Sequence, residues 1–321
     1  MDRREFLMSA AALGLVAGMP RLAFAQAMDQ IELFVPAAPG GGWDQTARVM
    51  EQVMRAEKLI GSARVTNVGG AGGTIGLPQF VNQYKGEGNA LMTGGMVMIG
   101  AIIANKSAVD LSAVTPIARL TGEFVTVVVP AESPHQNMQD LVAALKKDPG
   151  SVSWAGGSAG GTDHILAGLI AKDQGVDPTQ VSYVAFAGGG EAMAALLGNQ
   201  VTCGVSGWGE FAEQIGAGKL RALAISAPER VDGIDAPTLI EQGINVELLN
   251  WRGVFGPPEL DAAEKQGLVD IVTKMANSET WKKELATRNW DSLFLAGDAF
   301  DAYLKQDIAR IRGILEDLGL A

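Results

Sequence analysis

Residues 31–44 read IELFVPAAPGGGWD and combine three local patterns. Ile31–Val35 is an apolar run with high β-propensity, residues 39–42 form a Pro-Gly break, and residues 44–58 repeat apolar side chains at helical spacing. The stretch therefore predicts a strand that passes through a glycine-rich loop directly into a helix. Because this order recurs along the chain, the sequence predicts an α/β fold, with mainly parallel sheets and helices on both faces.

The same alternation can be followed to the C-terminus, where the pattern becomes mostly helical. At 321 residues, the chain exceeds the size at which a single core keeps growing, so two lobes are expected. Further strands are expected at 64–67, 90–93, 124–129, 151–154, 181–186, 201–205 and 220–226, and further helices at 74–84, 137–147, 162–174, 191–197, 262–275, 279–287 and 299–318.

The composition favours a binding protein over an enzyme. The chain carries 25 Lys and Arg against 36 Asp and Glu, a net charge of −11, whereas a nucleic-acid-binding protein needs a basic face. The single cysteine, Cys203, excludes an intrachain disulfide, and we interpret it as a small buried apolar residue. Two histidines, His135 and His164, leave little for histidine-based metal or acid–base chemistry.

Residues 1–25, MDRREFLMSAAALGLVAGMPRLAFA, have the pattern of an export signal. Arg3 and Arg4 precede a short apolar run, and the final Ala-Phe-Ala predicts cleavage near Ala25. The apolar run is shorter than the roughly 20 residues of a spanning helix. The paired arginines before Glu-Phe-Leu favour twin-arginine export, with an ordinary Sec signal as the alternative. The mature protein is expected in the periplasm.

Glycine-rich segments lie at the expected junctions between strands and helices. In open α/β sheets the ligand binds at the carboxyl ends of the strands. Glycine there lets backbone N–H groups approach an anion closely, and a helix N-terminus adds partial positive charge. These loops therefore predict an anion site that needs no lysine or arginine, the alternative being that the glycines only form tight turns. The segments are 39–42, 69–73, 94–95, 156–161 and 188–190.

One of these loops, residues 156–160, reads GGSAG and matches the G-x-S-x-G pattern of a hydrolase nucleophile. A serine hydrolase needs a histidine base. Only His164 follows Ser158, six residues later, which leaves no room for the intervening acid. We therefore favour a hydroxyl and free amides that bind a carboxylate, and keep a periplasmic serine hydrolase using Ser158 as an alternative.

Individual residues beside the loops have more than one interpretation. Asp44 either caps the following helix, holds the loop or accepts a hydrogen bond from a ligand hydroxyl. His164 either caps and packs or contacts the ligand, and Asp163 is interpreted as a helix-start residue. Trp251 is interpreted as core or hinge packing.

A series of motifs then follows in a fixed order. The first is VPAAPGGGWD at 35–44, and the second is NVGGAGG at 67–73. With these motifs the chain resembles the periplasmic solute receptors of tripartite tricarboxylate transporters, the TctC or Bug family, although Gly69 stands where many members of that family have proline. The remaining motifs lie at 155–164, 184–191, 218–224, 237–243 and 251–253.

The resemblance implies a type 2 periplasmic-binding-protein fold, in which two lobes joined by crossing strands close over a ligand. It implies a first lobe of residues 27–125 plus 226–321 and a second lobe of residues 126–225. A carboxylate would be bound largely through backbone amides and ordered water. The implied ligand-binding residues are Ala37, Ala38, Gly40, Gly41, Gly42 and Asp44 in the first lobe and Ser158, Ala159, Gly160, Gly161, Thr162 and His164 in the second, with Gly95 and Gly189 as further candidates.

The expected function is therefore that of a receptor rather than an enzyme, without a metal or an organic cofactor. It would capture a small carboxylate, a tricarboxylate such as citrate or a dicarboxylate, and deliver it to the integral-membrane permease subunits of a tripartite tricarboxylate transporter. A carboxylate receptor that reports to a sensor kinase is an alternative. The family-level expectation for the oligomeric state is a monomer.

Overall fold

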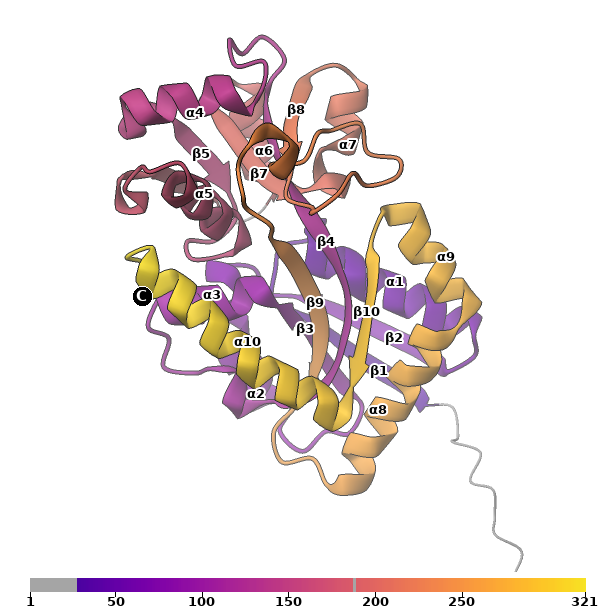
Figure 1. The fold of residues 1–321 in the computed structure, drawn as a ribbon. Coiled ribbons are helices and arrows are strands. Elements are labelled where there is room, and N and C mark those ends of the chain that lie inside the picture. Colours follow the sequence, from indigo (N-terminus) through magenta and orange to yellow (C-terminus); the bar gives the residue numbers. More distant parts are fainter. Residues whose placement is uncertain (1–27, 187–188) are drawn as a thin grey trace, which may run out of the picture.

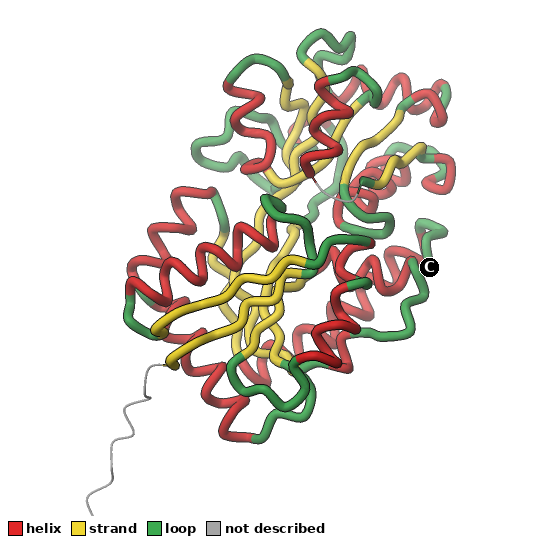
Figure 2. Tube along the Cα trace, turned by 180° about the vertical axis from the view of Figure 1, so that it is seen from behind, coloured by secondary structure: helices red, strands yellow, loops and turns green. Residues whose placement is uncertain are grey.

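The computed structural model describes residues 28–186 and 189–321, and their strands form two connected sheet regions (Figures 1 and 2). In the first region, β1 (Met28–Val35) pairs in parallel with β2 (Ile60–Asn67) on one side and β3 (Ala90–Gly95) on the other. Helical segments connect these strands, as parallel pairing requires. We call this region, with the elements packed on it, the first lobe.

Strand β4 (Thr115–Pro130) changes its pairing partners along its length. As far as Phe124 it pairs antiparallel with β9 (Leu249–Gly256), and on its other side with β10 (Asp291–Ala296). From Val125 onward it pairs antiparallel with β7 (Cys203–Gly207) and β8 (Leu220–Ile225). Strand β9 also pairs with β3. Strand β4 is therefore a direct covalent connection between the two sheet regions.

The second sheet region, which we call the second lobe, is built on β5 (Ser153–Gly156), which pairs in parallel with β6 (Ser182–Ala185) and β7. The predicted lobe boundary near residue 125 falls where β4 changes partner. Residues 226–248, predicted in the first lobe, instead lie largely against the second. Leu239 donates its N–H to the carbonyl of Ile225, and the side-chain amide of Gln242 donates to the carbonyl of Leu223.

Helices cover both faces of the sheet regions (Figure 1). None of the described helices is both long and apolar enough to cross a membrane. The first lobe carries α1 (Gly42–Ala56), α2 (Gly76–Gln83), α3 (Met96–Ala104), α8 (Ala262–Asn277), α9 (Glu279–Arg288) and α10 (Gly297–Asp317). The second lobe carries α4 (Met138–Lys147), α5 (Thr162–Asp173), α6 (Gly189–Leu197) and α7 (Trp208–Gly216).

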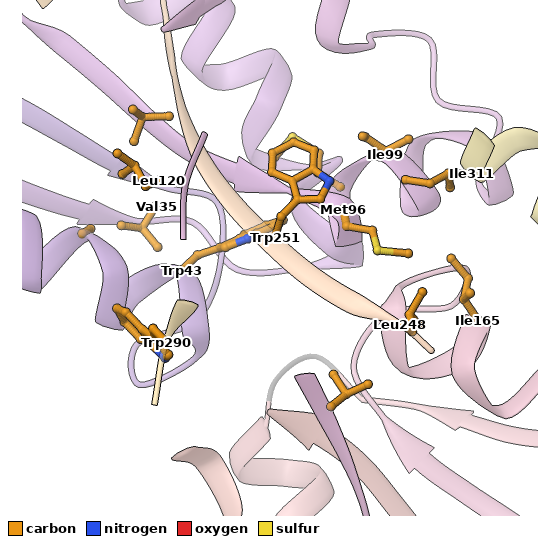
Figure 3. Packing of buried hydrophobic residues seen from close by; sticks show 14 of the residues in the cluster. Val35, Trp43, Met96, Ile99, Leu120, Ile165, Leu248, Trp251, Trp290 and Ile311 are labelled. Atoms are coloured by element: carbon orange, nitrogen blue, oxygen red, sulfur yellow. The ribbon is translucent and has the colours of Figure 1, made fainter. Parts of the chain in front are cut away.

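The largest hydrophobic cluster runs through both lobes, and Figure 3 shows Trp251 of β9 among the apolar side chains at its centre. The Trp251 ring packs edge-on against Phe300 and Tyr303, and its Nε1–H donates to the Asp307 carboxylate at 2.7 Å. Trp251 therefore packs in the core, as interpreted from the sequence. Cys203 is also fully buried, which confirms its interpretation as an apolar core residue.

The predicted α/β fold with two lobes and crossing strands is confirmed, including the parallel pairs around β1 and β5. Helices α3 and α7 and strands β9 and β10 were missing from the predicted elements. Three of these elements bear on the site, because α3 forms the contact between the lobes, α7 carries an acidic residue of the cavity and β9 carries a basic one.

Candidate functional site

A cavity of about 130 Å³ lies between the two lobes, beside the carboxyl ends of β1, β5 and β7. An engineered cavity of roughly 150 Å³ holds benzene, so this one has the size for a single small organic molecule. The first lobe contributes Pro36, Ala37, Gly41, Gly42, Trp43, Gly70, Gly72, Gly73, Val97, Asn250 and Arg252, and the second lobe contributes Gly156, Gly157, Ser158, Asp163, Ala192, Val205, Ser206, Glu210 and Phe211.

The loop between β1 and α1 is held in place by Asp44. The Asp44 carboxylate, 2% exposed, accepts hydrogen bonds from the Gly40 N–H at 2.9 Å, from Arg48 at 2.8 Å and from Asn67 at 2.9 Å. Gly40 has a φ of +88°, which favours glycine. Gly41, not Asp44, is the N-cap of α1. The capping interpretation of Asp44 is therefore wrong, and the loop-holding interpretation describes it.

Burial alone would raise the pKa of Asp44, but hydrogen bonds from Arg48, Gly40 and Asn67 outweigh burial and lower this pKa on folding. Ionised Asp44 therefore stabilises the fold at pH values above the pKa that Asp44 has in the unfolded chain. This stabilisation is lost as the pH falls through the lower pKa that Asp44 has in the folded protein. Asp44→Asn should therefore be less stable than the unaltered protein by about 1–3 kcal/mol at pH 7.

This deficit should shrink as the pH falls below 4, which urea unfolding across pH can measure. The matched control is Asp298→Asn, whose side chain is fully exposed and which should change stability little. An equal deficit at pH 7 and pH 3 would contradict the assigned role of ionised Asp44.

The corresponding loop of the second lobe is fixed by three side chains. The Asp163 carboxylate accepts the Gly157 N–H at 2.8 Å, and the Tyr183 hydroxyl donates to the Gly157 carbonyl at 3.0 Å. The His164 Nδ1 accepts the Gly160 N–H at 3.1 Å, and its ring stacks on Tyr183 with centroids 4.1 Å apart. Burial lowers the pKa of His164 to about 4, so the ring is neutral at pH 7. His164 is thus a positioning residue for this loop.

The two lobes touch through backbone at the rim of the cavity. A Cβ at Gly100 of α3 would overlap the carbonyl oxygen of Gly160, and one at Gly160 would overlap the side chain of Ala104. A Cβ at Gly72 would come within 3.0 Å of the Ser158 side chain. The small residues of α3 therefore allow the two lobes to approach each other closely beside the cavity.

Arg252 is the basic residue among those that line the cavity. Its side chain lies beneath Gly42, is 3% exposed, and forms an ion pair through Nη2 with Glu123 of the neighbouring strand β4. Its Nη1 has no hydrogen-bond partner among the described residues. Burial lowers the pKa of Arg252 to about 10, which leaves it charged at neutral pH. A buried cation with an unpaired donor is suited to bind an anionic group.

Two acidic residues line the same cavity from the second lobe. Burial and, second, the nearby Asp163 raise the pKa of Glu210 to about 7, against the opposing effect of hydrogen bonds from Ser206 and the Gly42 N–H. Burial raises the pKa of Asp163 to about 6, against the hydrogen bond from Gly157. The bond from Gly42 to Glu210 also links the first lobe to the second.

Of the predicted ligand-binding residues, the cavity brings together Ala37, Gly41, Gly42 and Ser158. Ala38, Gly40, Asp44, Ala159, Gly160, Gly161 and His164 lie in or beside the loops just described, but not in the cavity wall. Gly95 packs against the backbone of Trp251, and Thr162 donates to the Asn250 side chain at 3.2 Å. Gly189 begins α6, and Gly188 of the same segment lies outside the described residues.

Sequence reasoning did not identify Arg252, Asn250, Glu210 or Ser206 as site residues. Arg252 had a usable signal, because a lone arginine stands inside the apolar strand stretch WRGVF at 251–255. Glu210 had none, because it follows Trp208-Gly209 in a helix that the sequence pattern did not predict.

The geometry does not support the hydrolase alternative. The His164 Nδ1 is occupied by the Gly160 N–H, and the neighbouring Asp163 accepts from Gly157 rather than orienting the imidazole. Within residues 28–186 and 189–321, no hydrogen bond joins Ser158 to His164. A serine needs such a base to become a nucleophile.

Residues 46–320 match the pattern of the tripartite tricarboxylate transporter family receptor, TctC. The chain belongs to this family, whose members are substrate-binding receptors and not enzymes. A curated relative from Cupriavidus necator, the UPF0065 protein in the gbd 5′ region, is 30% identical over 100% of this chain and 99% of its own length.

Solved structures confirm the fold. The periplasmic binding protein BugD superposes with a TM-score of 0.81 at 23% identity, covering 91% of this chain and 98% of its own. MatC from Rhodopseudomonas palustris with bound malate gives a TM-score of 0.76 at 22% identity, over 89% of this chain and 99% of its own. The R. palustris protein Rpa4515 with adipate gives a TM-score of 0.79 at 20% identity, over 91% and 97%.

Proposed function

We propose that this protein is a periplasmic receptor that encloses one small carboxylate between its lobes. The observation that carries the proposal is the buried guanidinium of Arg252, a residue that lines the cavity together with glycine loops of both lobes and whose Nη1 has no hydrogen-bond partner among the described residues. Exclusion of water on closure strengthens hydrogen bonds between such donors and a carboxylate. In this proposal the ligand is bound from the first lobe by Arg252 and the loop around Gly41 and Gly42, and from the second by Ser158.

The size of the cavity and the ligands of its structural neighbours favour a small aliphatic carboxylic acid. MatC holds malate and Rpa4515 holds adipate. Citrate remains a candidate within the same class, since the family is named for tricarboxylates.

We further propose that the protein delivers its ligand to the integral-membrane permease of a tripartite tricarboxylate transporter. The membership of the TctC family supports this proposal, and the signal pattern of residues 1–25 supports export to the periplasm. A sensor kinase remains an alternative partner for the closed lobes. Deletion of the permease genes separates the two, because uptake of the labelled ligand would stop only if the receptor feeds that permease.

Binding is tested by thermal unfolding of residues 26–321 with citrate, malate, succinate, adipate and terephthalate. A ligand at 100 times its dissociation constant should stabilise the protein by about 2.7 kcal/mol and raise Tm by a few degrees. Protein that has been unfolded and refolded, so that no bound ligand remains, is the starting material. If no acid raises Tm of this refolded protein, the proposal that it binds these carboxylates is wrong.

A further inference from the structure

The cavity has two chemically different sides. Arg252 of β9 is the base among its described lining residues, whereas Asp163 and Glu210 are acids on the first turns of α5 and α7. Arg252 is already paired with Glu123, so the guanidinium does not compensate the two acids. The guanidinium side suits an anion, and the side of the second lobe suits a group that donates hydrogen bonds.

The acids have unused capacity to accept hydrogen bonds. A carboxylate has about four acceptor positions. Asp163 accepts from the Gly157 N–H, while Glu210 accepts from Ser206 and the Gly42 N–H. Neither carboxylate forms an ion pair with a described lysine, arginine or histidine. Acceptor positions in the cavity wall therefore remain for a ligand.

The second observation is independent of the acids. Arg252 is only 3% exposed, and its Nη1 lacks a hydrogen-bond partner among the described residues. Burial of an unpaired cationic donor is unfavourable unless a ligand completes its hydrogen bonds. One ligand carboxylate at Arg252 does so, and it orients the rest of the molecule toward the second lobe.

On the basis of the proposed function, we propose that the ligand carries one carboxylate for Arg252 and, at its other end, an O–H or N–H donor group that binds Asp163 and Glu210. A second carboxylate at that end would face Asp163 and Glu210 and would bind only if these acids took up protons, which disfavours it. A hydroxyl, a primary amide or an ammonium group supplies the required hydrogen. The shared chemistry is a carboxylate with a terminal proton donor.

The test compares each dicarboxylate with its own mono-amide, for example succinate with succinamate, in which an amide replaces one carboxylate at nearly the same shape. Titration calorimetry on residues 26–321 should give a dissociation constant at least about tenfold lower for the mono-amide. Amino and hydroxy acids of the same length distinguish an ammonium or hydroxyl donor from an amide donor. Equal or tighter binding of the dicarboxylate overturns the inference. This also holds if the dicarboxylate binds together with protons taken up by the acids, which calorimetry in buffers of different ionisation enthalpy detects.

A side-chain exchange locates the effect. In Glu210→Gln the glutamine amide supplies its own N–H donors, so the preference for the mono-amide should fall at least about tenfold or reverse. Glu213→Gln removes the same charge from an exposed position of α7 and should keep the preference. An unchanged preference in Glu210→Gln and in the matching Asp163→Asn overturns the inference. If dicarboxylates bind and mono-amides do not, the receptor proposal stands and this inference fails; if nothing binds, both fail.

Discussion

Arg252→Gln should abolish measurable carboxylate binding at concentrations that saturate the unaltered receptor. Arg252 lines the cavity and has an Nη1 donor with no partner among the described residues. Hydrogen bonds to charged groups contribute about 1.5–3 kcal/mol each, which corresponds to about a ten- to 150-fold change in the dissociation constant per bond. Titration calorimetry with the tightest ligand of the panel measures the loss.

The same substitution also removes the partner of Glu123, which is 4% exposed. An uncompensated buried charge typically costs about 3–5 kcal/mol of stability. Reduced binding by Arg252→Gln alone could therefore reflect partial unfolding. The paired variant Glu123→Gln/Arg252→Gln separates the two effects, because replacing both members of a buried pair is often neutral. The paired variant should recover most of the stability in urea unfolding and still fail to bind.

Arg119→Gln is the matched control for these variants. Arg119 lies on β4 in the same sheet, donates to the Leu293 carbonyl and stacks on Tyr303, outside the cavity wall. Its replacement should leave affinity unchanged. If the paired variant binds its ligand as tightly as the unaltered protein, Arg252 is a structural residue and the proposed carboxylate position is wrong.

The sequence predicts most of the fold because its elements have a clear period. The run that became β1 is apolar and is followed by a glycine-rich loop, β5 and β7 lie beside glycines, and α1 has one apolar face. The missed helix α3 reads MVMIGAIIA and is apolar on all sides, so no amphipathic pattern marks it. Most of its residues are buried against α10, β3 and β9 of the first lobe and α5 of the second, and the local sequence does not contain these contacts.

The candidate site was only partly predictable for a related reason. Backbone loops can be recognised locally, and Gly41, Gly42 and Ser158 of the predicted set do line the cavity. The charged residues are harder to assign to the site, although the lone arginine of the stretch 251–255 was a usable signal. Arg252 and Glu210 are far apart in the sequence and line one cavity only because β9 passes on one side of it and α7 begins on the other.

Gly100→Val should weaken ligand binding about five- to 150-fold without destabilising the protein. Gly100 lies inside α3, where its Cα faces the carbonyl of Gly160 in the second lobe, and a Cβ there would overlap that oxygen. Overpacking costs about 1–3 kcal/mol, and in the proposed receptor this cost applies only when the lobes close. Within the helix itself glycine is less favourable than most residues, so the open form should not lose stability.

The loss should be visible in the shape of the protein as well as in its affinity. The radius of gyration from X-ray scattering should decrease on addition of saturating ligand for the unaltered protein and less, or not at all, for Gly100→Val. Gly313→Val is the matched control: Gly313 also lies inside a helix, α10, but a Cβ there meets nothing within 4 Å. Normal affinity and normal compaction in Gly100→Val would contradict the prediction, because the lobes would then close on the ligand without the close backbone contact between α3 and Gly160.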